Sequence, residues 1–222
     1  MVWFKSLDKY VFKDIHTYSL RHRTDNTYYM DHIDELMRLH PSKTIVYQIG
    51  ESKCLQVFRD ADRPTIIYVH GRGEDLGLMA RYELLQSMAD MSDCSVVGME
   101  YPGYGSDSFA NVSSKKVVEN LVELYQILAK DRGSIILYGY SLGTGIAMKA
   151  LYTMMKQKLQ LPNMVILEGA FTSLLNANIP SNKRLAKYIG IDLYRTHRIL
   201  NGAHSAGGAH SASGAHSASG AR

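Results

Sequence analysis

The residues from Ile135 to Ala147 constrain the fold of this chain more than any other stretch. A short apolar run, Ile135 to Tyr138, has the length of one buried strand. It leads into Gly139-Tyr140-Ser141-Leu142-Gly143, a G-x-S-x-G pentapeptide, and apolar residues then recur at helical spacing up to Met155. A serine between glycines, with a strand before it and a helix after it, indicates a nucleophile elbow. The alternative is an ordinary glycine-rich turn between a strand and a helix.

The two glycines of the pentapeptide have a physical role in such a turn. A sharp turn forces Ser141 into a strained backbone conformation, and Gly139 and Gly143 let strand and helix pass closely because they carry no side chain. The hydroxyl is then exposed at a helix N-terminus, where backbone N–H groups favour developing negative charge. Two phosphate-binding motifs are excluded, because a G-x-G-x-x-G would need glycine in place of Met148 and a Walker A motif would need it in place of Thr144.

Composition excludes several classes of protein. The 222 residues are 45% hydrophobic and 21% charged, which is typical of a globular protein with one domain of ordinary size. The formal net charge of +4 is small and the basic residues are scattered, so we expect no nucleic-acid partner. The cysteines, Cys54 and Cys94, lack the spacing of a zinc site, and we expect free buried thiols, no metal and no cofactor.

The N-terminus and the hydropathy pattern predict a cytoplasmic protein. Charged residues interrupt the first turns of the chain, so the segment lacks the apolar core of a signal peptide. No run reaches the roughly 18–20 apolar residues of a spanning helix. Apolar residues of this segment could form a stripe that contacts a membrane surface peripherally, although packing on the chain's own domain is the commoner outcome. They are Val2, Trp3, Phe4, Leu7, Tyr10 and Val11.

Strands and helices are expected to alternate after an initial hairpin. The apolar patterns predict helices over residues 24–40, 78–88, 117–128 and 143–155. They predict strands over residues 44–49, 53–58, 65–69, 95–99, 135–138 and 164–167. This order predicts an α/β protein with a mainly parallel sheet and helices on both faces. The glycine-rich turns follow the strands, at the carboxyl edge where open α/β sheets bind ligands.

We expect three segments along the chain. Residues 1–42 would be an N-terminal helical segment, residues 43–200 a partial α/β domain and residues 201–222 a tail. The tail is a GAHSAS-type repeat without Leu, Ile, Val, Phe or a carboxylate. It buries too little apolar surface to offset the entropy of ordering, so we expect it to be disordered. Its histidines, His204, His210 and His216, would bind a metal only weakly.

Four motifs between residues 65 and 200 carry a resemblance to the α/β-hydrolases. They are Val69-His70-Gly71, Tyr101-Pro102-Gly103-Tyr104-Gly105, Gly139 to Gly145 and Leu167 to Ser173. The chain is most similar to the branch of α/β-hydrolase domain-containing serine hydrolases that includes acyl-protein thioesterases and lysophospholipid or monoacylglycerol lipases. The resemblance implies a serine hydrolase of acyl esters or thioesters, acting on a small-molecule or lipid substrate or on an acylated protein.

The resemblance also implies roles for individual residues. Ser141 would be the nucleophile, and the backbone N–H groups of Leu142 and Arg72 would form the oxyanion hole. Such donors must converge on the oxygen of a tetrahedral intermediate formed at the serine. His70 would be the family's structural histidine beside this loop and not the general base. The Arg72 side chain would either favour an anionic head group or point into solvent.

A base and an acid for Ser141 are hard to find in the sequence. In this fold an Asp or Glu and then a His follow the serine, on loops after later strands. Glu168 ends a strand beside the elbow and is a weak candidate for the acid. Asp192 and His197 are too close in sequence to lie on loops from two different strands, so the triad base stays unidentified.

The repeat begins near residue 200, where the family's remaining strands and histidine loop would be expected. The chain therefore resembles the first part of the fold, with its C-terminal strands missing, and a shifted reading frame or truncated gene copy is one hypothesis. The leading function is hydrolysis through an acyl-Ser141 intermediate. The alternative is a catalytically dead, truncated hydrolase-like protein that lacks the triad Asp and His. Acyl transfer to an acceptor other than water stays open.

Overall fold

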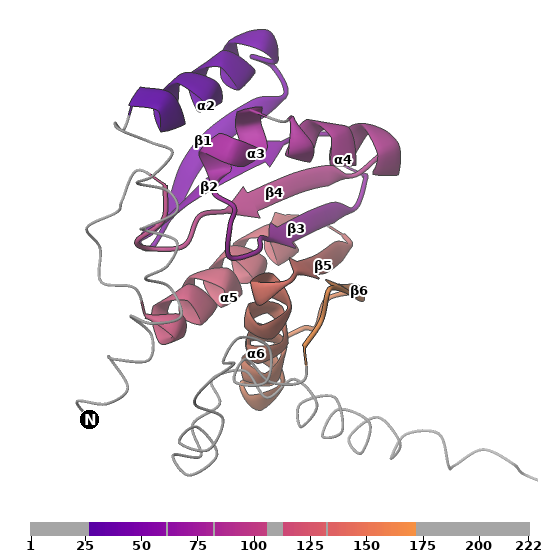
Figure 1. Cartoon of the computed structure of the whole chain (residues 1–222). Helices are drawn as coiled ribbons and strands as arrows, with labels where there is room; N and C mark the ends of the chain where they lie inside the picture. The colour runs from indigo at the N-terminus through magenta and orange to yellow at the C-terminus, as the bar shows by residue number, and fades with distance from the viewer. Residues whose placement is uncertain (1–26, 61, 82, 106–112, 132, 172–222) are drawn as a thin grey trace, which may run out of the picture. The chain divides into compact units, whose positions relative to one another are not determined.

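One sheet organises the described part of the chain. The computed structural model describes residues 27–60, 62–81, 83–105, 113–131 and 133–171 (Figure 1). Within these ranges six strands form a single sheet. In spatial order they are β1 (Thr44–Ile49), β2 (Ser52–Val57), β4 (Ser95–Met99), β3 (Thr65–Val69), β5 (Ile135–Tyr140) and β6 (Met164–Glu168).

The strand directions confirm the predicted α/β class. β1 and β2 form an antiparallel hairpin, and β2 also runs antiparallel to β4. From β4 through β3 and β5 to β6 the strands are parallel, so their carboxyl ends meet at one edge of the sheet. β3 lies between β4 and β5 and is buried along its whole length, as expected for a run of β-branched and aromatic residues in a central strand.

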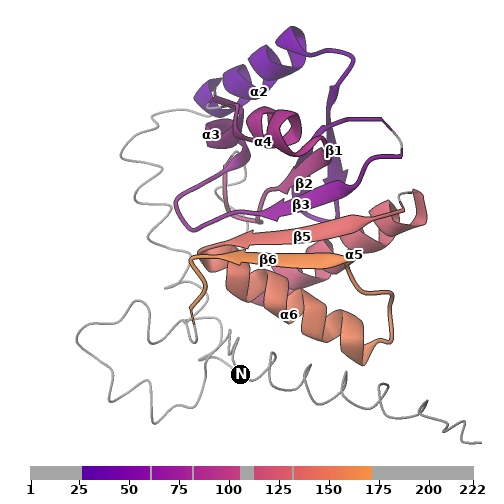
Figure 2. The same cartoon turned by 90° about the vertical axis from the view of Figure 1, so that its right-hand side faces the viewer.

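Helices cover both faces of the sheet, as predicted. α2 (Thr27–Leu39), α3 (Leu76–Arg81) and α4 (Leu84–Ser92) pack with one another and against β1, β2 and β4. α5 (Ser114–Asp131) packs against α6 (Leu142–Lys156), and α6 packs against β5 and β3 from the other face. Figure 2 shows α6 along β5 and β6, with α2, α3 and α4 on the opposite side of the sheet.

Each face of the sheet has its own apolar core. On the α2–α4 face, Ile66 and Tyr68 of β3 join a buried cluster with residues of all three helices. On the other face, Leu137 and the α6 residues Ile146 and Ala150 are fully buried. Burying a leucine or isoleucine side chain of this kind stabilises a fold by about 1.5–3 kcal/mol, so both layers contribute to the stability of the sheet.

The helix predicted after β3 is wrong in one respect, because the structure divides it into α3 and α4. Glu83, between the two helices, has a φ of 48° and a left-handed conformation. A residue in that conformation cannot continue a right-handed helix. The two helices nevertheless bury their apolar residues on the same side of the sheet. Leu76 of α3 and Leu85 of α4 are both buried, and both approach Gly98 of β4.

Several other predictions can be compared with the described residues. Cys54 and Cys94 are free and buried, as predicted. No helix among the described residues is long and apolar enough to cross a bilayer. The N-terminal apolar stripe, the GAHSAS-type repeat and the predicted loss of the last strands lie outside the described residues. The segment limits at residues 42 and 200 stay predictions.

Candidate active site

The backbone of Ser141 makes an abrupt turn between β5 and α6. Its φ of 49° and ψ of −114° lie in a region that residues with a side chain rarely occupy. Hydrogen bonds fix this conformation from both sides. The Ser141 N–H donates to the main-chain oxygen of Glu168 at 2.8 Å. The main-chain oxygen of Ser141 accepts from the Thr144 N–H at 2.9 Å and from the Thr144 hydroxyl at 2.7 Å.

Gly139 and Gly143 are placed where no side chain fits. A Cβ on Gly139 would lie 2.7 Å from the Gly143 oxygen, and a Cβ on Gly143 would lie 1.8 Å from the Val69 oxygen. The start of α6 therefore touches the end of β3 directly. The pentapeptide thus has glycine at the two positions where the close passage of strand and helix excludes every other residue.

The hydroxyl of Ser141 stands at the N-terminus of α6, and the serine is partly exposed. It makes no hydrogen bond to another residue of the described ranges, and it does not cap the helix. Leu142, the first residue of α6, has a buried side chain and a backbone N–H at the helix start. The first N–H groups of a helix have no partner within it, and they point toward an anion placed there.

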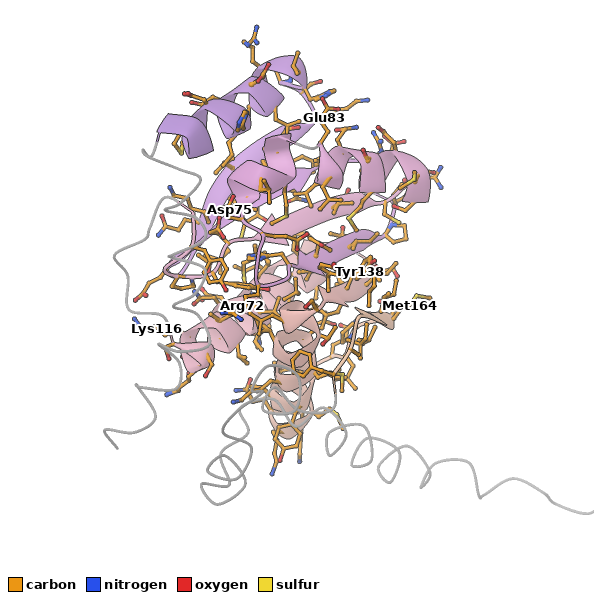
Figure 3. All side chains as sticks on the ribbon, viewed as in Figure 1. Arg72, Asp75, Glu83, Lys116, Tyr138 and Met164 are labelled. Carbon is orange, nitrogen blue, oxygen red and sulfur yellow. The ribbon has the colours of Figure 1, made fainter. Side chains whose placement is uncertain are left out.

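Arg72, labelled in Figure 3, lies on a tight turn that follows the end of β3. The turn runs from Gly71 to Glu74, and the Glu74 N–H donates to the Gly71 oxygen at 3.4 Å. A Cβ on Gly71 would be 3.0 Å from the ring of Tyr140, the residue that precedes Ser141. The structure therefore brings the predicted oxyanion-hole residues, Leu142 and Arg72, to the same edge of the sheet as Ser141.

His70 is buried and engaged away from Ser141. Its ring stacks on Tyr101 with 3.9 Å between centroids, Nδ1 lies 2.8 Å from the Gly71 oxygen, and Nε2 lies 3.5 Å from Glu100 Oε1. Glu100 also accepts the Leu76 N–H at 2.9 Å. Burial lowers the pKa of His70, but the Glu100 carboxylate, the Gly71 carbonyl and the Glu74 charge together raise it more, so the net pKa lies above the usual value for histidine. This geometry is that of a group that supports the loop after β3.

Glu168 is bonded to Ser141 through its main-chain oxygen, while its side chain is bonded to Tyr138. Its carboxylate accepts a hydrogen bond from the Tyr138 hydroxyl, and the glutamate is exposed. That hydrogen bond, together with desolvation, raises the pKa of Tyr138 to about 12, so the phenol remains a donor at neutral pH. The ring of Tyr138 meets the ring of Tyr68 edge to face, with 5.5 Å between centroids.

The triad base stays unidentified, and Asp192, His197 and the histidines of the repeat lie outside the described residues. Besides His70, the described ranges contain His32 and His40. His32 lies in α2 and His40 directly follows it, and both precede Ser141 by a long stretch of sequence. No group of three His, Cys, Asp or Glu side chains arranged for a metal occurs within those ranges.

The sequence analysis missed four side chains that shape this edge: Tyr68, Glu74, Glu100 and Tyr138. Glu100 carried a signal, because a carboxylate directly after a buried strand is costly to bury without a partner. Glu74 also carried one, since it stands three residues after Gly71 in a short turn, where its side chain can reach back to the Gly71 amide. The two tyrosines look like ordinary strand residues in the sequence.

No protein-family model matches this chain, and no curated protein matches it in sequence. Solved structures do match its fold. An alpha-beta hydrolase from Vibrio vulnificus superposes with a TM-score of 0.61 at 15% identity, covering 89% of this chain and 71% of that one. The chain therefore has the α/β-hydrolase fold, as its motifs predicted.

Two further matched structures are named as a lipase and an esterase. A hormone-sensitive lipase from a metagenome library has 23% identity and a TM-score of 0.47, over 65% of this chain and 49% of that one. An esterase from Pyrobaculum calidifontis has 17% identity and a TM-score of 0.45, over 63% of this chain and 49% of that one. Against eight of the matched structures, the chain spans between 47% and 71% of the other protein's length.

Proposed function

We propose that this protein is a serine hydrolase that cleaves acyl esters or thioesters through an acyl-Ser141 intermediate. The observation that carries the proposal is the backbone of Ser141, with a φ of 49° and a ψ of −114° at the junction of β5 and α6. A conformation of this kind costs on the order of 1–3 kcal/mol, and such strain is concentrated at functional sites. An ordinary turn between strand and helix has no need of it.

The proposed reaction uses the groups that the turn collects. The Ser141 Oγ attacks the acyl carbonyl carbon while a base takes its proton. The base then gives this proton to the alcohol or thiol, which leaves as the tetrahedral intermediate collapses to the acyl-enzyme. The carbonyl oxygen becomes negative on the way, and the backbone N–H groups of Leu142 and Arg72 are the donors proposed to receive it. Water then releases the acid and restores the serine. The general base stays unassigned.

A second candidate is a hydrolase-like protein without catalysis. It is favoured by one observation: among the described residues, no histidine is hydrogen-bonded to the Ser141 hydroxyl, and the His70 ring faces Glu100 instead. Because serine needs a base within about 2.6–3.2 Å to act as a nucleophile at neutral pH, a chain that supplies none would bind acyl groups without cleaving them.

Labelling with a fluorophosphonate probe distinguishes the two candidates. We expect the purified full-length chain to be labelled, and Ser141→Ala to lose the label. Ser87→Ala is the matched control, because this serine lies on α4, away from the elbow. A folded wild-type chain that takes no label after long incubation with the probe would rule out the hydrolase and leave the binding function.

The substrate class is part of the proposal. An acyl chain needs an apolar surface near the serine, and Tyr140, the residue directly before Ser141, is a large side chain that is 36% exposed. Comparison of a p-nitrophenyl ester with the matching thioester, each at two acyl lengths, would separate esterase from thioesterase preference. Peripheral membrane contact through the N-terminus remains a proposal, and binding of the full chain to lipid vesicles would test it.

A further inference from the structure

The Glu74 carboxylate closes the turn that carries Arg72. Its Oε2 accepts the backbone N–H of Gly71 at 2.7 Å, while its own backbone N–H donates to the Gly71 oxygen at 3.4 Å. Glu74 is therefore bonded to Gly71 twice, once through its side chain and once through its main chain. These two bonds fix the orientation of the peptide groups between them, and those include the N–H of Arg72.

Tyr68 holds the Glu74 carboxylate in position. Its hydroxyl donates to Glu74, 3.2 Å from Oε2 and 3.4 Å from Oε1. Tyr68 belongs to β3 and its side chain is buried, with only 5% of its surface exposed. Burial and the neighbouring Glu74 charge raise the pKa of Tyr68, so its hydroxyl stays protonated and keeps donating. The turn is thus tied to a rigid central strand.

The same turn is in contact with the Ser141 elbow. The Tyr140 ring would lie 3.0 Å from a Cβ placed on Gly71, so there is no free space between the two. The start of α6 touches the end of β3 at Val69 and His70. The position of the Arg72 amide relative to Ser141 therefore depends on how firmly the turn is held.

The bond to Glu74 also limits which backbone N–H groups of this turn are proposed to donate to the substrate oxygen. It occupies the Gly71 N–H, so this amide already has an acceptor. The next amide along the chain is that of Arg72. A carboxylate is a stronger acceptor than a neutral group, and a charge-assisted hydrogen bond of this kind resists rotation of the peptide it holds.

We infer that Glu74, oriented by Tyr68, is a positioning residue that presents the Arg72 N–H to the carbonyl oxygen of the substrate. This inference rests on the proposed function and adds to it a residue that never touches the substrate. Displacement of a reacting group by about 1 Å can cost on the order of a hundredfold in rate, so loss of the bond should lower turnover with little change in substrate binding.

The test compares Glu74→Ala, Glu74→Gln and Tyr68→Phe with the wild-type chain. For Glu74→Ala we expect kcat on a p-nitrophenyl ester to fall by about 10- to 100-fold with KM nearly unchanged, and fluorophosphonate labelling to slow in parallel. Glu74→Gln keeps an oxygen acceptor and should stay within about threefold of the wild type. Tyr68→Phe should lie between the two. Glu123→Gln, an exposed glutamate on α5, is the matched control.

The outcomes separate this inference from the proposed function. A wild-type chain that is never labelled overturns the proposed function and the inference with it. A labelled wild type together with a Glu74→Ala variant that is labelled equally fast overturns the inference alone. So does a fall in kcat that only matches the fraction of unfolded protein, measured by circular dichroism. If Glu74→Ala does not fold, Tyr68→Phe decides, and an unchanged kcat in that variant overturns the inference.

Discussion

The backbone N–H of Ser141 is hydrogen-bonded to the main-chain oxygen of Glu168, 2.8 Å away. The two residues stand at the carboxyl ends of adjacent parallel strands, where Tyr140 pairs with Glu168 in the register. This hydrogen bond extends the pairing of β5 with β6 by one residue beyond the end of β5. The strained serine is thereby held by β6, the last strand in the described part of the sheet, as well as by its own helix.

The role of Glu168 can be tested with Glu168→Gln. Because Tyr138 already occupies the carboxylate and contact with Ser141 runs through the main chain, we expect labelling of Ser141 to change by less than about threefold. Loss of a triad acid would instead cost about 10⁴-fold in rate. The rate of fluorophosphonate labelling measures the difference. A drop of a thousandfold would make Glu168 the acid after all.

Ser141→Gly should stabilise the protein while removing its reactive group. Glycine occupies a φ of 49° without steric cost, so we expect the free energy of unfolding to rise by about 1 kcal/mol relative to Ser141→Ala. Urea unfolding of the two variants measures the difference. Ser141→Ala is the reference because it keeps the Cβ and therefore the strain. Equal midpoints would show that the backbone at Ser141 is not strained.

Among glycine-to-alanine substitutions in the G-x-S-x-G pentapeptide, Gly143→Ala should lower the stability of the fold most. The new Cβ would meet the Val69 oxygen at 1.8 Å, and a backbone oxygen can move away only if β3 or α6 shifts. We expect a loss of about 3 kcal/mol or more, seen as a lower midpoint in thermal unfolding. Gly133→Ala is the control, because its Cβ would meet nothing within 4 Å, and it should stay within about 0.5 kcal/mol.

The buried pair of His70 and Glu100 predicts how stability depends on pH. The folded pKa of His70 is raised above the value of 6.5, so this pair stabilises the fold fully below that pH. The contribution is lost as the pH rises through the folded pKa. Denaturant unfolding measured from about pH 6 to pH 9 should therefore show the free energy of unfolding declining with pH.

Glu100→Gln supplies the matching control for that pH profile. Without the carboxylate, only the Gly71 carbonyl and the Glu74 charge oppose the lowering of the His70 pKa by burial, so the decline of stability with rising pH should weaken or disappear. Removal of one partner of a buried ion pair typically costs about 3–5 kcal/mol, so the variant is best measured in a stabilising osmolyte. A wild-type profile that is flat across this range would contradict the assignment of a charged His70.

Both cysteines should be inert in the folded protein. Burial raises the pKa of Cys54 to about 12, with a smaller contribution from Glu100, so almost no reactive thiolate is present at neutral pH. Cys94 is likewise buried, with 6% of its surface exposed. A thiol reagent such as DTNB should react slowly with native protein and rapidly in denaturant. Fast reaction of one thiol in native protein would mean that its region opens locally.

The sequence analysis predicted the order of elements and the serine turn, because these depend on local patterns. The runs of β-branched residues and the glycines around Ser141 leave few alternatives for each short segment. The break at Glu83 could not be predicted, because the apolar period continues through it. The break accompanies a tertiary contact, since Leu76 of α3 and Leu85 of α4 both approach Gly98 of β4.

The residues that tie the site together were harder to predict from sequence. The bonds of Glu74 to Gly71 and Tyr68, and of Glu100 to Leu76, join side chains to amides that become neighbours only after folding. A sequence pattern records periodicity along one element, and these contacts cross from one element to another. The role of Glu168 was left open for the same reason, because its side-chain partner Tyr138 comes from the adjacent strand.

The order of strands has a consequence for how the molecule is made. β3 pairs with β5 although β4 and α5 intervene in sequence, and the main-chain partner of Ser141 lies still later, at the end of β6. As the chain leaves the ribosome, the serine emerges before the strand that holds it. Contacts so distant in sequence form slowly. The turn at Ser141 should therefore acquire its final shape late, and a nascent chain that stops before β6 should carry an unreactive serine.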